Sequence, residues 1–90
     1  MTNEEVARVF EELAEMLEKR GELIFKTRAY RKAAAGIRQL DVPLDVYRRE
    51  RDLKEIPGVG DAIARKISDL LDTGSFKLLE ELRRGDPGRL

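Results

Sequence analysis

The sequence contains neither cysteine nor histidine among its 90 residues. The absence of cysteine excludes a disulfide framework and any metal site built on thiolates. The absence of histidine removes the side chain that most often serves as a general base and as a metal ligand. Any chemistry must therefore use lysine, carboxylate, tyrosine, serine or threonine side chains, or the main chain.

Long apolar runs are also missing. No stretch approaches the roughly 20 residues that a membrane-spanning helix needs, and the start, "MTNEEVARVF", is too acidic for a signal peptide. We therefore expect a protein of the cell interior, cytoplasmic or associated with the nucleoid, with no membrane partner. Ninety residues correspond to one small domain, near the lower end of the length that folds on its own core.

Charge is unevenly distributed, although the formal net charge is zero. Residues 1–22 carry seven acidic and three basic side chains, residues 23–54 carry four and nine, and residues 55–90 carry seven and six. A basic middle segment can present a positive surface even in a neutral chain. Charge alone favours the simpler interpretation, that these are the solvated helix faces of a charge-rich small protein.

The first segment predicts an amphipathic helix. Thr2 and Glu5 have the spacing of a capping box, and Gly21 stands where such a helix would stop. Its apolar residues recur at three- and four-residue steps: Val6, Val9, Phe10, Leu13, Met16 and Leu17. In so short a chain this stripe is expected to form core.

A second helix is expected from about Thr27 to Leu40. Its inner face carries small residues that would let another helix approach closely: Ala29, Ala33, Gly36, Ile37 and Leu40. Its basic residues lie off that face and are expected to point outward: Arg28, Arg31, Lys32 and Arg38.

Shorter helices are expected in the remainder of the chain. They span about 44–50 after Pro43, one or two turns in 51–56, about 61–72 with Gly74 as its stop, and a last helix capped by Ser75. Their inward residues would be Ile63, Ile67, Leu70, Leu71, Phe76, Leu79 and Leu82. No run alternates in the manner of a strand. The fold class is therefore all-α, a compact bundle of four or five short helices.

The stretch "IPGVGDAIARKI", residues 56–67, joins two of these helices. Ile56 and Val59 can anchor the turn in the core, while Gly58 and Gly60 would leave main-chain N–H groups uncovered. The free N–H groups of the helix that begins at about Asp61 point into the same loop, which makes an anion site. A tight interhelical turn without a ligand explains the glycines equally well.

This stretch resembles the helix-hairpin-helix motif that grips the DNA backbone. Together, "FKTRAYRKAAAGI" and "DLKEIPGVGDAIARKISDLLDTGSFKLLEELR" are similar to the amino-terminal domain of family X DNA polymerases, which include DNA polymerase beta. The resemblance implies one helical DNA-binding domain over residues 1–84, with the motif at about 52–73. Residues 85–90 would be a tail or a junction to the polymerase domain of a longer parent chain.

The resemblance also implies a function in DNA repair: sequence-independent binding to gapped or nicked DNA on its 5′-phosphate side. Lys26 matches a lysine that holds this phosphate, Tyr30 matches a tyrosine lining the same pocket, and Arg31 and Lys32 match basic neighbours. The implied hairpin contacts to DNA are Gly58, Val59, Gly60, Asp61 and Ala62. A monovalent cation, Na⁺ or K⁺, would be held by the main-chain carbonyls of Lys54, Ile56 and Val59, and no other cofactor is implied.

Lys66 aligns with the lysine that forms a Schiff base in family members with 5′-deoxyribose-phosphate lyase activity. At about 100° per residue, Lys66 lies on the shoulder of the apolar stripe, where burial would lower the pKa of its amine. Spacing alone favours an ordinary lysine that extends from a helix edge. Two departures weaken the parallel, because Ala62 and Leu78 stand where the family has basic residues. We therefore expect gap binding with weak or absent lyase activity.

Phe25 stands where the family has a polar residue that stacks on a template base. Its ring could stack on a base or belong to the core.

The alternative function is a helical protein-interaction module that keeps the hairpin as scaffold. Such a module would show salt-insensitive DNA binding, or none, and an exposed apolar patch. Polymerization is not expected in these residues, because no cluster of carboxylates is present to hold two metal ions.

Overall fold

The computed structural model describes residues 1–85, and within them it contains helices and no strand. The elements are α1 (Asn3–Lys19), α2 (Ile24–Arg38), α3 (Leu44–Glu50), the 3₁₀ helix η1 (Leu53–Glu55), α4 (Asp61–Thr73) and α5 (Lys77–Arg83). The predicted all-α class is confirmed. None of the described helices is long and apolar enough to cross a membrane. The predicted C-terminal tail falls almost entirely on residues 86–90, outside the described residues.

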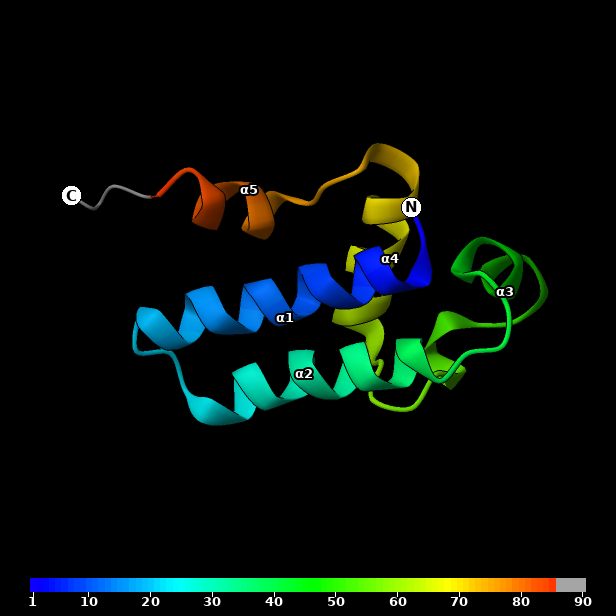
Figure 1. Ribbon diagram of the computed structural model, residues 1–90, viewed down its shortest axis with the longest axis horizontal. Coiled ribbons are helices and arrows are strands. Elements are labelled where there is room, and N and C mark those ends of the chain that lie inside the picture. The colour runs from blue at the N-terminus through cyan, green and yellow to red at the C-terminus, as the bar shows by residue number, and fades with distance from the viewer. Residues whose placement is uncertain (86–90) are drawn as a thin grey trace.

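The antiparallel pair α1 and α2 forms the frame of the domain (Figure 1). Helix α4 crosses behind this pair, and α5 lies along the opposite side of α1 from α2. Phe10 of α1 is fully buried at the centre, with the rings of Tyr30 and Phe76 stacked on it at centroid distances of 6.0 Å each. One aromatic stack thus joins α1, α2 and the start of α5.

Local sequence signals account for the predicted start of α1 and the predicted end of α4. Thr2 and Glu5 form the predicted capping box, with the Glu5 N–H donating to Thr2 Oγ1 at 3.0 Å and the Thr2 N–H to Glu5 Oε1 at 2.7 Å. Gly74 ends α4 in the left-handed conformation that glycine adopts without strain. The Asn3 side chain connects distant segments, since its Oδ1 accepts from the Leu44 N–H at 2.8 Å.

Three details of the predicted helices were wrong. Helix α2 begins at Ile24, three residues earlier than expected. The sequence did not indicate this start, because no capping side chain marks it. Ala29 is exposed, since the buried face of α2 is centred on Ala33, Ala34 and Ile37. Ser75 does not cap α5: Phe76 is the N-cap residue, without a side-chain hydrogen bond, and the Thr73 hydroxyl donates to the Ser75 carbonyl at 2.9 Å.

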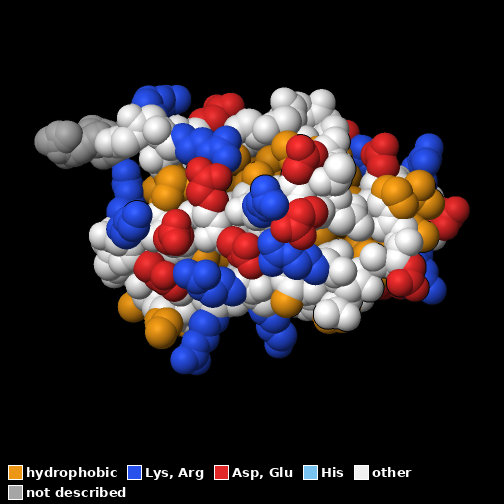
Figure 2. Space-filling view, in the orientation of Figure 1, with side chains coloured by type: hydrophobic (Ala, Val, Ile, Leu, Met, Phe, Trp, Pro, Cys, Tyr) orange, Lys and Arg blue, Asp and Glu red, His pale blue; other side chains and the backbone are white. Residues whose placement is uncertain are grey.

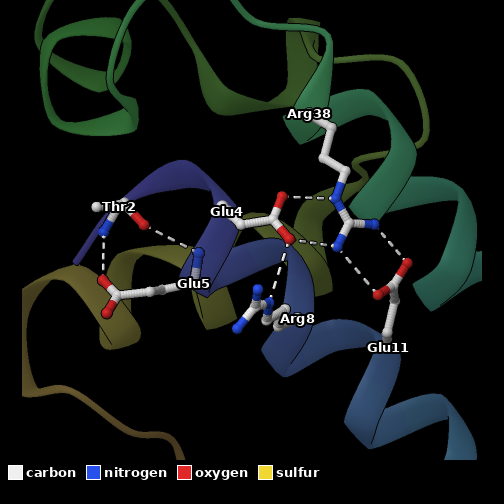
Figure 3. A network of polar contacts seen from close by, with 6 residues as sticks. All are labelled: Thr2, Glu4, Glu5, Arg8, Glu11 and Arg38. Atoms are coloured by element: carbon white, nitrogen blue, oxygen red, sulfur yellow. Dashed lines mark hydrogen bonds and ion pairs between the residues drawn. The ribbon is translucent and has the colours of Figure 1, made fainter.

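Two arginines of α2 that were expected to point outward instead reach carboxylates on α1. The Arg38 guanidinium lies between Glu4 and Glu11, with Nε 2.8 Å from Glu4 Oε1 and Nη2 3.1 Å from Glu11 Oε1 (Figure 3). Arg31 donates to Glu18 at 2.8 Å. The acidic first segment therefore neutralises part of the basic middle segment along the α1–α2 seam.

Gly36 allows the hairpin between η1 and α4 to rest directly on α2. A Cβ at this position would lie 2.3 Å from the Pro57 carbonyl oxygen and 3.2 Å from Ile56 Cγ2. Real side chains do not approach main-chain oxygens this closely, so the contact requires glycine. The small residues of α2 were expected to admit another helix, and at Gly36 the neighbour is the hairpin main chain.

Gly36→Ala is therefore expected to destabilise the domain. In an open helix this change stabilises by about 0.5–1 kcal/mol, but here the overlap with Pro57 should cost about 1–3 kcal/mol. Urea unfolding followed by circular dichroism measures the net effect. A higher unfolding midpoint, the usual response to removing a helical glycine, would show that the hairpin does not lie this close to α2.

The Arg38 network should make stability depend on pH in the acidic range. Hydrogen bonding from Arg38 lowers the pKa of Glu4 from 4.5 to about 2. A carboxylate with a lowered pKa stabilises the fold above its ordinary pKa, and this contribution is lost as the pH falls toward 2. The melting temperature of Arg38→Met should lie below that of the unchanged protein at pH 7, with a smaller difference at pH 2.5. An equal difference at both pH values would contradict the coupling.

Candidate nucleic-acid interface

The hairpin between η1 and α4 is anchored as the sequence predicted. Ile56 and Val59 are 1% and 6% exposed. Gly58 has a φ of +88°, and a Cβ there would lie 3.0–3.1 Å from the side chain and main chain of Lys32. Both the turn and its packing on α2 therefore require glycine at this position.

Gly60 differs from Gly58, because nothing within the domain requires it. Its backbone angles, φ −99° and ψ −168°, are extended and open to any residue. A Cβ at Gly60 would meet no atom within 4 Å. The missing side chain thus leaves a bare, exposed stretch of main chain at the start of α4.

Main-chain N–H groups without partners gather at this point. Within residues 1–85, the N–H groups of Gly58, Gly60, Asp61 and Ala62 donate no hydrogen bond, and the N-cap residue Gly60 provides no capping side chain. Val59 is the exception, since its N–H donates to the Ile56 carbonyl at 3.0 Å. Free N–H groups at a helix N-terminus, combined with the positive end of the helix dipole, favour an anion.

Asp61 places a carboxylate beside these N–H groups, but the carboxylate is held by a lysine. Its Oδ1 lies 3.0 Å from Lys54 Nζ, and this contact raises the pKa of Lys54. The N-cap position belongs to Gly60, so Asp61 is the first residue of α4. This ion pair across the hairpin is absent from the sequence-based expectations, since no helical spacing rule links two residues seven positions apart across a turn.

The main-chain oxygens predicted to hold a monovalent cation lie on the same hairpin. Within the described residues, the carbonyl oxygens of Lys54 and Val59 accept no hydrogen bond, while that of Ile56 accepts one from Val59. Oxygen donors of this kind suit Na⁺ or K⁺, and two of the three are free to bind one. The residues present therefore fit the implied cation.

Lys66 lies at the edge of the buried face of α4, as its spacing predicted, and it is partly buried. Its amine lies near two aromatic rings. Nζ is 5.9 Å from the ring centroids of both Tyr30 and Phe76. Burial lowers the pKa of the Lys66 amine, and the charge of Asp69 partly opposes this shift. The sequence assigned Phe76 to the core; its second role as a neighbour of the lysine depends on how α5 returns to α1.

Two shallow hollows meet at Ala62 and Leu78, the two positions where the resemblance implied basic residues. One hollow is also lined by Lys26 and Tyr30, and the other by Lys66 with further charged residues. The charged residues of the second hollow are Arg65, Asp69, Lys77 and Glu81. The structure thus brings Lys26, Tyr30 and Lys66 around one apolar junction.

The other predicted DNA contacts lie elsewhere on α2. Lys32 packs on Gly58 at the hairpin, whereas Arg31 is bound to Glu18 on the α1 side. Phe25 is 64% exposed, next to Leu23 and Ile24 at 58% and 63%, so its ring is not part of the core. Hydrophobic side chains are visible over the start of α2 at the lower left of Figure 2.

Comparison with known proteins agrees with this geometry. A family model described as "Helix-hairpin-helix domain" matches residues 1–76. The chain belongs to the helix-hairpin-helix domain family. This helix-hairpin-helix domain is also 31% identical over 87 residues to the DNA polymerase/3′-5′ exonuclease PolX of Bacillus subtilis (strain 168). The alignment covers 97% of this chain and 15% of that protein.

PolX is a family X DNA polymerase, and the match falls in its N-terminal region. The resemblance read from the hairpin and its upstream segment is therefore confirmed. This helix-hairpin-helix domain spans about 15% of the length of that relative.

The environment of Lys66 leads to a prediction about its amine. NMR titration of Nζ should give a pKa below the ordinary lysine value of 10.5 because the amine is partly buried. Asp69→Asn should lower this pKa further, since the carboxylate of Asp69 favours the charged amine. A Lys66 pKa at or above 10.5, or an upward shift in Asp69→Asn, would show that the amine is not held in this environment.

Proposed function

We propose that this helix-hairpin-helix domain is a DNA-binding domain of a family X polymerase, and that it binds the DNA backbone without reading bases. The observation that carries the proposal is Gly60: the fold does not require glycine there, yet its absent side chain leaves unpartnered N–H groups open to a close neighbour. A phosphate group is such a neighbour, and contacts from the main chain to phosphate carry no sequence information.

The 5′-phosphate side of a gap or nick is the proposed target. Lys26, Tyr30 and Lys66 surround the junction of the two hollows, next to Ala62 at the start of α4. Lys66 and the helix N-terminus would attract a terminal phosphate, and Lys26, whose Nζ lies 3.5 Å from Glu22 Oε1, would have to exchange this longer ion pair for the phosphate. Lys32 would contact the strand at the hairpin. We assign Arg31 a smaller role, because Glu18 already neutralises its charge.

A monovalent cation would complete the hairpin site. The carbonyl oxygens of Lys54, Ile56 and Val59 would hold Na⁺ or K⁺, with two of them free of hydrogen bonds within the described residues. When bound, the cation would add positive charge next to a backbone phosphate.

A titration of gapped DNA tests the proposed function. Duplexes with a 5′-phosphate and with a 5′-hydroxyl at the gap are compared by fluorescence anisotropy at two salt concentrations. We expect tighter binding to the phosphorylated gap, and affinity that falls with salt by about 0.9 logarithmic units per neutralised phosphate for each tenfold rise. Equal affinity for both ends would refute gap recognition, and binding unaffected by salt would refute backbone recognition.

Gly60→Ala should separate binding from folding. The added methyl group has free space in the unbound domain, so stability should fall by less than about 1 kcal/mol, the difference between glycine and alanine as a helix cap. On DNA the same methyl group would meet the backbone, and we expect at least a tenfold loss of affinity. The melting temperature serves as the folding control, and unchanged affinity would show that the DNA does not approach Gly60.

Lyase activity through Lys66 is proposed to be weak or absent. Burial lowers the pKa of the Lys66 amine, which would favour nucleophilic attack, but Ala62 and Leu78 place apolar groups where a phosphate would be held. Borohydride trapping on a 5′-deoxyribose-phosphate substrate should give little adduct, and Ala62→Lys should increase it. A strong adduct in the unchanged protein that disappears in Lys66→Ala would show a competent lyase.

The second candidate is a protein-interaction module, favoured by the exposed apolar residues Leu23, Ile24 and Phe25. An exposed apolar cluster on a small domain is typical of a binding surface. The salt titration separates the two candidates, because a module of this kind would show salt-insensitive DNA binding or none.

A further inference from the structure

We propose that Lys54 is a positioning residue that holds the Asp61 carboxylate away from the hairpin N–H groups and so keeps the anion site open. The inference rests on the proposed function and assigns a role to an ion pair that joins two elements, η1 and α4, and stabilises neither helix from within. Lys54 Nζ lies 3.0 Å from Asp61 Oδ1, across the turn that joins η1 to α4.

The position of Asp61 makes such control necessary. Asp61 is the first residue of α4, next to the unpartnered N–H groups of Gly60 and Ala62. A carboxylate at a helix N-terminus is attracted both by free N–H groups and by the helix dipole. Gly60, the N-cap residue, has no side chain to compete for them. Without Lys54, Asp61 would therefore turn toward the N–H groups that the proposed phosphate needs.

Lys54 counters this carboxylate in two ways. It holds Asp61 by a direct contact, and its positive charge offsets the repulsion between Asp61 and an approaching phosphate. Lys54 is itself fixed on the hairpin, since its N–H donates to Asp52 Oδ1 at 2.9 Å and its Nζ lies 4.0 Å from Asp52 Oδ2. Lys54 and Asp61 also line a separate hollow together with Arg65. Arg65 makes no ion pair within residues 1–85, so Lys54 is the cation that holds Asp61.

This role differs from a direct contact between Lys54 and DNA. A direct contact would contribute the same affinity whether or not residue 61 is charged. A positioning role disappears when the carboxylate is removed. The two roles are distinguished by comparing Lys54→Met in the unchanged protein with Lys54→Met in an Asp61→Asn background.

The experiment measures binding of the four proteins to gapped, 5′-phosphorylated DNA at fixed salt. We expect Lys54→Met to weaken binding about fivefold or more, Asp61→Asn to strengthen it, and Lys54→Met in the Asp61→Asn background to change it less than twofold. Lys19→Met, which removes an exposed lysine of α1, measures the effect of losing one charge. Equal losses from Lys54→Met in both backgrounds would overturn the positioning role.

A second measurement needs no DNA. In Lys54→Met, amide NMR shifts of Gly60, Asp61 and Ala62 should change as the carboxylate turns toward them, and these shifts should follow its protonation as the pH is lowered. In Lys54→Met/Asp61→Asn this pH dependence should vanish. Unchanged amides in Lys54→Met would overturn the inference. Amides that respond in a domain that binds no DNA would refute the proposed function and leave the positioning role intact.

Discussion

Close contact between the main chains of α2 and the hairpin is the constraint on which the rest of the structure depends. Gly36 admits the Pro57 carbonyl, and Gly58 lies against Lys32. These contacts leave no room for a side chain, so the hairpin has one position on α2. The N-terminus of α4, and Lys66 one turn into it, are thereby fixed relative to Tyr30 of α2.

The sequence predicted the features that depend on one short segment. Thr2 and Glu5 cap α1, Gly74 ends α4, and Ile56 and Val59 anchor the hairpin, because each depends on residue types at fixed spacing. The shoulder position of Lys66 followed from helical periodicity alone. The family resemblance, and not spacing, directed attention to the region around this lysine.

Features that depend on how two elements are placed relative to each other could not be predicted. The pairing of Arg38 with Glu4 requires knowing that α1 and α2 lie antiparallel with a particular register, which periodicity does not specify. The contact between Lys54 and Asp61 requires the conformation of the turn. The early start of α2 was missed because "LIF" carries no capping signal, and the same three residues proved to be exposed.

The ion pairs along the α1–α2 seam also give the domain a polarity toward a polyanion. Glutamates at positions 4, 11 and 18 of α1 take up the guanidinium groups that lie nearest to them, Arg38 and Arg31. Lys32 makes no ion pair within the described residues and sits at the hairpin. Because these carboxylates and guanidinium groups neutralise one another, the α1–α2 seam would offer a nucleic acid little net positive charge, whereas Lys32 at the hairpin keeps its charge. A neutral chain can thus set the direction of an encounter by the arrangement of its charges alone.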